Sequence, residues 1–271
     1  MDNTRTDLAM ESLAGNETLP DGVTRAEYEL RGFRVTDMEI RDEQAAKLLC
    51  KPAGRYLTVE TERFFRREEN AFADGAAILA DLMRQLLPLR PDDSVLVAGL
   101  GNREITPDAV GPETVAATLV TRHLVEQLPA EFGSFRPVCA FATGVLGTTG
   151  LESASLIRAL FDAAKPRAVV AVDALAARER ERLCRTDQLT DSGIVPGSGV
   201  GNARQELSAR VFGVPVLAVG VPTVVDEGDG LILTRRDIDK CVRDIGRLLG
   251  YALDLALQDG LSVTDIDMLI G

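Results

Sequence analysis

Short, wholly apolar runs alternate along this chain with segments whose apolar residues recur at helical spacing. This alternation constrains the fold more than any other feature of the sequence. The runs Val95–Leu100, Val169–Val172 and Val214–Val221 contain no polar side chain, which is typical of strands buried on both faces of a parallel sheet. Leu151–Ala164 has the spacing of an amphipathic helix. The sequence therefore predicts an α/β fold, a three-layer αβα arrangement with a mostly parallel central sheet.

The first part of the chain has a different pattern, in which apolar and polar residues alternate. Phe33–Ile40 and Arg55–Glu60 both show this alternation, which indicates half-buried strands. We therefore expect a small antiparallel β element near the N-terminus. Residues 1–25 are polar and acidic without sustained periodicity, so they are expected to form a loosely held leader. The chain shows no internal repeat, linker or low-complexity tract, which favours a single domain.

The charge balance and the hydropathy of the chain argue against several classes of function. A formal net charge of -12 disfavours nucleic acid or an anionic membrane as a partner, because both require clusters of Lys and Arg. No apolar run reaches the ~18–20 residues that a membrane-spanning helix needs. The first residues lack the apolar stretch of a secretory signal, so we expect a cytoplasmic location.

Histidine and cysteine, which are frequent at metal centres, are scarce and scattered in this chain. His123 is the one histidine, so a histidine-rich zinc site is impossible, and a Ser-His-Asp triad would need His123 itself. Its place in the segment 115–124 predicts an ordinary position on the surface of a helix. The four cysteines form no CxxC pair and are expected to be free thiols. We therefore expect no metal and no cofactor.

Two aspartates that follow apolar runs are the strongest candidates for a catalytic role. Asp108 lies just past Val95–Leu100, after a proline that stiffens its loop, and Asp173 directly follows Val169–Val172. In an open α/β sheet, ligands bind in the crevice outside the carboxyl ends of the strands. A pair of carboxylates there can act as general base and general acid, and close approach raises the pKa of one of them. Hydrolysis is therefore the leading hypothesis.

Each aspartate also has a simpler interpretation as a helix cap. Asp108 precedes a helix that begins near Gly111, and Asp173 precedes a possible helix over residues 175–183. The occurrence of two such aspartates at the ends of strands favours the functional interpretation.

Two glycine-rich stretches are expected to line the same crevice. Gly101 and Asn102 belong to a stretch that resembles GxGxxG, but Glu104 stands where the third glycine is required, so a dinucleotide site is not expected. The second stretch can offer backbone N–H groups to an anion or a peptide carbonyl, and its candidate lining residues are Gly197, Ser198, Gly199, Gly201 and Asn202. Arg178 is a further candidate, because its guanidinium can steady a carboxylate. The alternatives are a plain flexible turn and a solvated helix arginine.

Several segments, distributed over nearly the whole chain, together carry a resemblance to a known family. They are residues 6–9, 51–60, 99–112, 144–152, 173–178, 193–202 and 220–226. Each segment is a weak signal by itself, whereas the set in this order is highly specific. In this order the segments closely resemble the germination protease family of spore-forming bacteria.

The resemblance implies an endopeptidase that initiates the degradation of small acid-soluble spore proteins during germination and is made as an inactive zymogen. It implies an α/β fold related to the hydrogenase-maturation proteases, and assembly as a homotetramer in the spore core. The two essential aspartates of the family match Asp108 and Asp173. We expect an aspartic-type dyad without a metal, since no histidine lies at a plausible ligand position.

The leader contains a segment that resembles the sites this family cleaves, which lie after an acidic and before an apolar residue. Residues 6–11 are similar to the family's Thr-Glu-(Phe/Ile)-Ala-Ser-Glu context. We therefore predict self-cleavage between Asp7 and Leu8, which makes residues 1–7 a propeptide and residues 8–271 a single α/β peptidase domain. The chain departs from the family in its shorter leader and in the short stretch after Asp226.

Two rival functions stay open at this point. A metal-dependent maturation protease of the hydrogenase-processing type would trim a single partner protein, and chelators would inhibit it. A non-catalytic binding scaffold would keep the fold and would tolerate asparagine at both Asp108 and Asp173.

Overall fold

The computed structural model describes residues 6–13, 18–197, 205–227 and 231–270. Its strands are β1 (Val23–Leu30), β2 (Phe33–Ile40), β3 (Gly54–Glu60), β4 (Val95–Gly99), β5 (Val138–Ala142), β6 (Ala168–Ala177), β7 (Thr186–Thr190), β8 (Val216–Asp226) and β9 (Ile232–Thr234). Its α-helices are α1 (Glu43–Leu49), α2 (Glu62–Phe65), α3 (Ala71–Leu86), α4 (Val110–Ala116), α5 (Arg122–Gln127), α6 (Pro129–Phe132), α7 (Leu146–Thr149), α8 (Ser153–Ala164), α9 (Ala209–Phe212), α10 (Ile238–Leu257) and α11 (Val263–Ile270). Short 3₁₀ turns are η1 (Ala9–Leu13), η2 (Thr106–Asp108) and η3 (Arg180–Arg182). Within these ranges, no helix is both long and apolar enough to cross a bilayer.

The strands described form one nine-stranded mixed sheet in the order β1-β2-β3-β7-β8-β6-β4-β5, and β9 pairs with the end of β8. The strands β8, β6, β4 and β5 run parallel to one another. All the other pairs are antiparallel. The predicted α/β class, with a parallel core and antiparallel strands near the N-terminus, is confirmed. The antiparallel part is larger than the sequence predicts, because β7 and β9 also belong to it.

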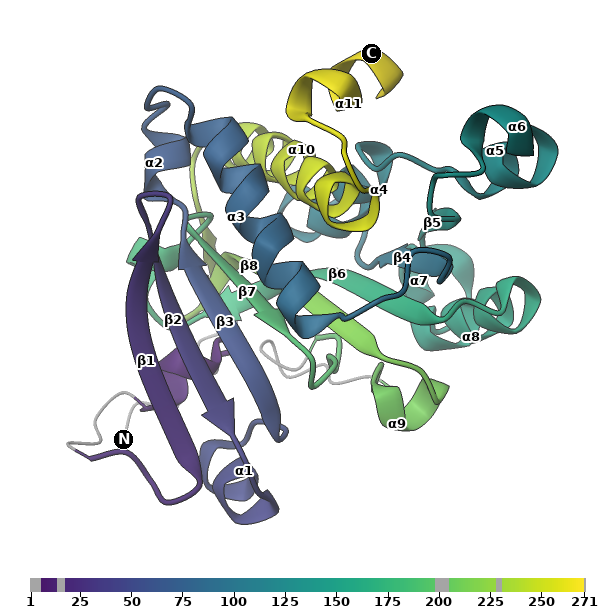
Figure 1. Cartoon of the computed structure of the whole chain (residues 1–271). Helices are drawn as coiled ribbons and strands as arrows, with labels where there is room; N and C mark the ends of the chain where they lie inside the picture. Colours follow the sequence, from purple (N-terminus) through teal and green to yellow (C-terminus); the bar gives the residue numbers. More distant parts are fainter. Residues whose placement is uncertain (1–5, 14–17, 198–204, 228–230, 271) are drawn as a thin grey trace.

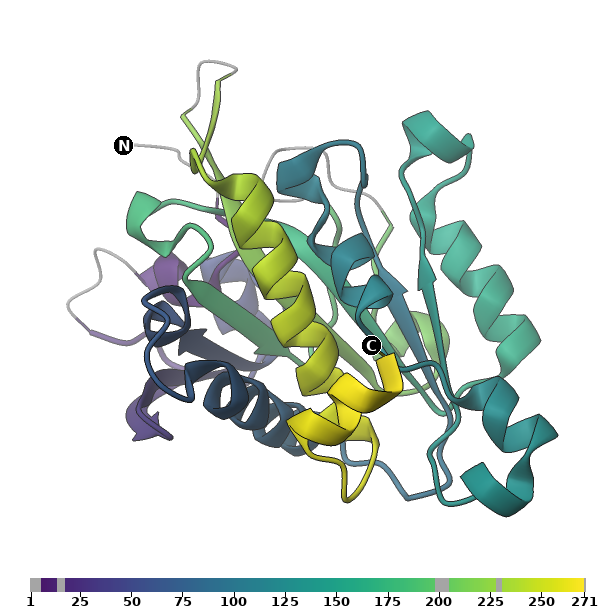
Figure 2. The same cartoon turned by 90° about the horizontal axis from the view of Figure 1, so that it is seen from above.

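Helices cover both faces of the sheet, as Figure 1 and Figure 2 show from two directions. The helices α3, α4 and α10 pack together on one face, and α8 and α9 cover the other. Successive residues of the central strands contribute to different cores: Val97 and Val170 belong to the first, and Leu96 and Val169 to the second. Because neighbouring side chains in a strand point to opposite faces, a strand between two helical layers has no solvated face for polar residues.

The strand β6 is longer than its apolar run predicts, so Asp173 does not lie where the strand ends. The expected helix over residues 175–183 does not form; β6 continues through Ala177 instead. Its neighbour β8 pairs with it as far as Ala177↔Val225, so the backbone groups on that side of the segment are satisfied in the sheet. Asp173 therefore lies inside a strand and caps no helix.

The expectation of a loosely held leader is wrong for residues 6–13. Leu8 and Ala9 are completely buried, and Leu13 is nearly so. Ala9 and Leu13 pack against the N-terminal strands, whereas Leu8 packs against the distal half of β6 and its neighbours. The segment is thus part of the apolar packing of the fold.

Candidate active site

The carboxyl end of β4 is the point at which the connectivity of the parallel strands reverses. From β4 the chain passes to β5 on one side and then returns to β6 on the other. Loops diverge at such a switch point, and the crevice between them is the usual ligand site of open α/β sheets. The loop after β4 carries Asp108, and Asp173 lies one position beyond Gly99↔Val172, the last β4–β6 pair.

A cavity of about 490 Å³ lies at this point, and both Asp108 and Asp173 line it. Its walls also include residues of β8, of β9 and of the loop after β4: Leu100, Gly101, Ile105, Pro107, Thr223, Val224, Ile232 and Thr234. Asp7 of the leader lines the cavity as well. The fold thus brings the two aspartates, which are distant in sequence, to one hollow.

The backbone of the loop after β4 holds the Asp108 carboxylate in place. The Asn102 N–H donates a hydrogen bond to Asp108 Oδ2 at 2.8 Å, and the Asp108 N–H donates to the Ile105 carbonyl at 2.7 Å. Gly101 has a φ of 108° and lies directly against Asp108, where a Cβ atom would collide with the Asp108 carbonyl oxygen. Both the backbone angle and the close approach therefore require glycine at this position.

Asp173 is more buried than an ionised carboxylate normally is, with an exposed fraction of 5%. This burial raises the pKa of Asp173 well above its ordinary value, and the charges of Asp108 and Asp7 raise the pKa further. A hydrogen bond from the Ala174 N–H to Asp173 Oδ1, at 2.9 Å, acts in the opposite direction. A carboxyl group with a raised pKa beside a second carboxylate is the combination that general acid–base catalysis uses.

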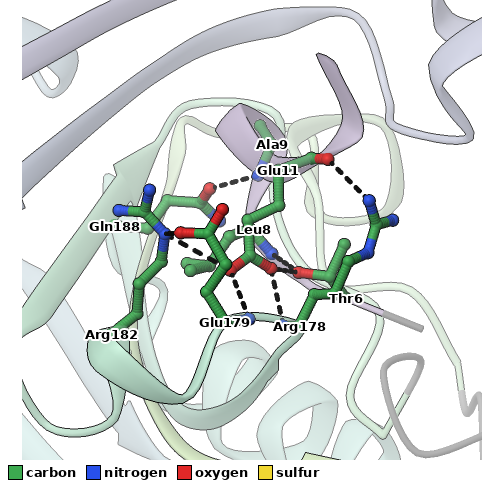
Figure 3. Close-up of polar contacts among 8 residues, drawn as sticks. All are labelled: Thr6, Leu8, Ala9, Glu11, Arg178, Glu179, Arg182 and Gln188. Carbon is green, nitrogen blue, oxygen red and sulfur yellow. Dashed lines mark hydrogen bonds and ion pairs between the residues drawn. The ribbon is translucent and has the colours of Figure 1, made fainter. Parts of the chain in front are cut away.

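The leader approaches the cavity along the edge of β6 that β4 leaves uncovered. Asp7 pairs with this edge twice: its N–H donates to the Ala176 carbonyl, and its Oδ2 accepts from the Ala176 N–H, both at 2.9 Å. Farther along, Glu11 accepts from the N–H groups of Arg178 and Glu179 (Figure 3). Asp7 thus satisfies an edge N–H group that a neighbouring strand would otherwise bind. Glu11 satisfies two N–H groups in the bend that follows β6.

Gln188 of β7 contacts the leader backbone on both sides of Leu8. Its Oε1 accepts from the Ala9 N–H at 2.7 Å, as Figure 3 shows, and its Nε2 donates to the Asp7 carbonyl at 3.2 Å. Lys51 adds a third contact, since its Nζ donates to the Thr6 carbonyl at 2.7 Å. The Asp7–Leu8 peptide bond is therefore held beside the cavity by side chains of the sheet and of the loop before β3.

Only some of the lining residues predicted from the sequence are found at the cavity. Gly101 and Gly197 line the cavity, and Asn102 contributes its backbone N–H to Asp108. Arg178 does not line the cavity, and it follows β6 instead of lying on a helix. Its backbone N–H donates to the Glu11 carboxylate at 2.7 Å, and its guanidinium donates to the Glu11 carbonyl oxygen at 3.2 Å. The remaining candidates lie outside the described residues: Ser198, Gly199, Gly201 and Asn202.

The sequence prediction did not single out three residues that contact the leader or belong to it. Gln188 lies in a polar strand that has no apolar alternation, so no local pattern marks it. Lys51 begins one of the segments that carry the family resemblance, and this was the available signal. Glu11 lies within the segment that resembles a cleavage site, but its burial depends on the docking of that segment.

A metal-dependent maturation protease would need ligand side chains grouped around its metal ion. Within the part of the chain that the structure describes, no group of three His, Cys, Asp or Glu side chains is arranged to hold a metal ion. His123 is exposed on α5, which agrees with the surface position expected for it.

Comparisons with known proteins place the chain in a family. A [NiFe] hydrogenase maturation protease from Thermococcus kodakarensis is similar over 65% of this chain and 99% of that chain, with a TM-score of 0.40 and 17% identity. Germination proteases from Clostridium tetani and Caldanaerobacter subterraneus are 42% and 36% identical, covering 97% and 98% of this chain and 98% of each relative. One from Bacillus licheniformis is 43% identical over 89% of this chain and 66% of its own length. The family model described as germination protease matches residues 5–247, so this chain belongs to the germination protease family.

Proposed function

We propose that this chain is an endopeptidase that initiates the degradation of small acid-soluble spore proteins during germination, with Asp108 and Asp173 as its catalytic carboxylates. Membership in the germination protease family supports peptidase activity, and therefore a hydrolase. The observation that carries the choice of site is the cavity at the end of β4, which both aspartates line together with Asp7 of the leader. On the family resemblance alone, we propose a homotetramer in the cytoplasm of the spore core.

In the proposed mechanism the two aspartates have different roles because their environments differ. Asp173 is buried and its pKa is raised, so it holds a proton and acts as the general acid. Asp108 is less buried and accepts the Asn102 N–H, which suits an ionised general base. Asp108 takes a proton from water as the water oxygen bonds to the peptide carbonyl carbon. Asp173 then donates its proton to the leaving nitrogen as the C–N bond breaks.

The leader supports this proposal because Asp7, the residue before the proposed cut, lines the same cavity as the two carboxylates. The carbonyl oxygen of the Asp7–Leu8 bond accepts from Gln188 Nε2. A donor on that oxygen stabilises the negative charge that develops there during hydrolysis. We therefore propose that the chain is a zymogen whose residues 1–7 are a propeptide, and that it cleaves itself at this bond.

Mild acidification of the purified chain is expected to produce a species that begins at Leu8. Burial and the charges of Asp108 and Asp7 raise the pKa of Asp173, so mild acidification increases the fraction of Asp173 that carries the proton to be donated. Intact-mass measurement over time would detect the product. Asp108→Asn serves as the control and should stay uncut. The absence of a species starting at Leu8 would contradict self-cleavage.

Incubation of the processed protein with a small acid-soluble spore protein tests the function itself. We expect the substrate to be cut at a few internal sites, and we expect EDTA to leave the rate unchanged, as measured by mass spectrometry of the fragments. Loss of activity in EDTA, with recovery on adding nickel or zinc, would support the metal-dependent maturation protease. Binding without any cleavage would support the non-catalytic scaffold.

A further inference from the structure

Two of the chain's cysteines, Cys184 and Cys241, meet in the interior although they lie far apart in the sequence. Both are free thiols, and both are buried in the core that includes side chains of α3 and α10. The Cys184 thiol donates a hydrogen bond to the Cys241 sulfur. The two sulfur atoms are therefore neighbours in the folded chain, and no local sequence pattern marks the pair.

The backbone around Cys184 fixes the position of its thiol. Cys184 lies between η3 and β7 with a φ of 60°, a left-handed conformation that is uncommon for a residue with a side chain. Its N–H donates to the carbonyl of Pro222 in β8 at 2.7 Å. Because an unfavourable backbone angle persists only where the surrounding structure holds it, Cys184 is a fixed partner for Cys241.

Only one sulfur of the pair lies at a cavity that solvent can enter. Cys241 lies in the first turn of α10 and lines a cavity of about 320 Å³, whereas Cys184 is not among the described residues that line it. The cationic residues of the wall, some of them exposed, are Arg66, Arg67, Arg185, Arg235 and Lys240. A small oxidant in this cavity therefore reaches Cys241 first, and Cys184 lies behind it.

The surroundings of the two thiols also differ in charge. The Arg235 guanidinium donates to the Cys241 sulfur, and it is oriented by a two-point pair with Asp237 at 2.9 and 3.0 Å. The hydrogen bond from Cys184, together with Arg235, lowers the pKa of Cys241 to about 7 against the opposing effects of burial and of Asp237. The same hydrogen bond and burial raise the pKa of Cys184. Since the thiolate is the nucleophilic form of cysteine, Cys241 is the more reactive of the two at neutral pH.

We propose that Cys241 and Cys184 form a dithiol site that hydrogen peroxide oxidises to a disulfide, with Cys241 as the attacking cysteine and Cys184 as the resolving one. The Cys241 sulfur bonds to a peroxide oxygen as the O–O bond breaks, and hydroxide leaves and takes up a proton. The Cys184 sulfur then bonds to the Cys241 sulfur of the resulting sulfenic acid as the S–O bond breaks, and water leaves with the Cys184 proton. Two thiols become one disulfide, and one peroxide is reduced to two waters.

The disulfide would connect two parts of the fold that are joined only by packing in the reduced chain. Cys241 belongs to α10, which packs against α3 and α4. Cys184 directly follows Leu183, which packs against Leu8 of the leader. The bridge would thus tie the segment that contacts the leader to the helical layer. Neither cysteine lines the catalytic cavity, so the oxidation does not depend on the proposed function.

The test is peroxide treatment of the reduced full chain at pH 7, followed by blocking of the remaining thiols with iodoacetamide and mass spectrometry of the peptides. Cys50 is exposed and is replaced by Ser in every protein, so that it does not link two chains. We expect a peptide pair joined through Cys184 and Cys241. Cys139 is the internal reference, because burial raises its pKa, and Cys241 should react at least about 10-fold faster.

Three variants separate the roles of the groups. Cys184→Ser should leave a sulfenic acid on Cys241 that dimedone traps, because no thiol is present to resolve it. Arg235→Gln should slow the reaction of Cys241 about 10-fold, since the thiolate loses its cationic partner. Arg243→Gln is the matched control, because Arg243 is exposed on the same helix and does not line the cavity; its rate should equal that of the parent.

The proposal would be overturned if both cysteines kept their thiols under peroxide, or if Cys241 reacted no faster than Cys139. It would also fail if Cys184→Ser gave neither a dimedone adduct nor any other change from the parent chain. Melting temperatures of the reduced variants check that each one is folded. The chain unfolded in guanidinium chloride should lose the selectivity for Cys241, since only the fold brings Arg235 and Cys184 to its sulfur.

Discussion

Asparagine at Asp108 or at Asp173 is expected to reduce hydrolysis of a spore-protein substrate by about 100- to 10,000-fold, the range for loss of a general acid or base. The amide has nearly the shape of the carboxyl group, but it can neither take a proton from water nor give one to the leaving nitrogen. Asp92→Asn is a matched control, because Asp92 is exposed and lies outside the cavity. Initial rates from fragment mass spectrometry are the measurement. Full activity in either site variant would remove that residue from the mechanism.

The melting temperature of Asp173→Asn distinguishes a variant that is folded but inactive from one that is unfolded. Because burial raises the pKa of Asp173 in the folded state, the folded protein loses stability as the pH rises from the unfolded pKa of about 3.9 through the raised value. Asp173→Asn has no charge to bury. It should therefore melt at a higher temperature than the parent protein near pH 7, and the difference should vanish below about pH 4. A variant that is inactive because it is unfolded would show the opposite change.

The second large effect is expected from Gly101→Ala, which adds one methyl group beside Asp108. Its Cβ would collide with the Asp108 carbonyl oxygen and lie 3.0 Å from the Asp108 Oδ1 atom, at a backbone φ of 108°. The loop after β4 must then shift and move the carboxylate. A displacement of about 1 Å at a reacting group costs on the order of 100-fold in rate. The strained backbone is expected to cost about 1–3 kcal/mol of folding free energy.

Gly147→Ala is the control for the Gly101 substitution. Gly147 lies in α7, and a Cβ there meets no atom within 4 Å, so both activity and melting temperature should stay close to those of the parent. The informative quantity is the ratio of the two initial rates, measured on proteins whose circular dichroism spectra match. An active Gly101→Ala protein would show that the loop can move without displacing the Asp108 carboxylate, and the rigid loop would then have no role in positioning it.

Much of the parallel core could be predicted from the sequence, because a strand between two helical layers must be apolar on both faces. Val95–Leu100 and Val169–Val172 have this property: β4 covers the first run as far as Gly99, and β6 contains the second. Asp108 could be singled out by similar reasoning, since it comes soon after a buried strand and ligands bind outside the carboxyl ends of such strands. These signals are local, and they depend only on burial and on the order of elements along the chain.

The remaining features depend on neighbours that are distant in sequence. Asp173 lies within a strand because β8 continues to pair beside it, and nothing near residue 173 in the sequence records that pairing. The polar strand β7, with Gln188, forms because β3 and β8 hold it between them.

The sequence by itself determined the chemistry of this protein, namely which side chains carry carboxylates and which runs must be buried. Only the tertiary structure decided where the leader lies. Its burial depends on the edge of β6 that becomes uncovered where β4 ends, on the Arg178 and Glu179 N–H groups that donate to Glu11, and on Gln188 of β7, whose Oε1 accepts from the Ala9 N–H. An uncovered strand edge is a property of the assembled sheet, so a segment that looks like a loose tail in the sequence becomes part of the site.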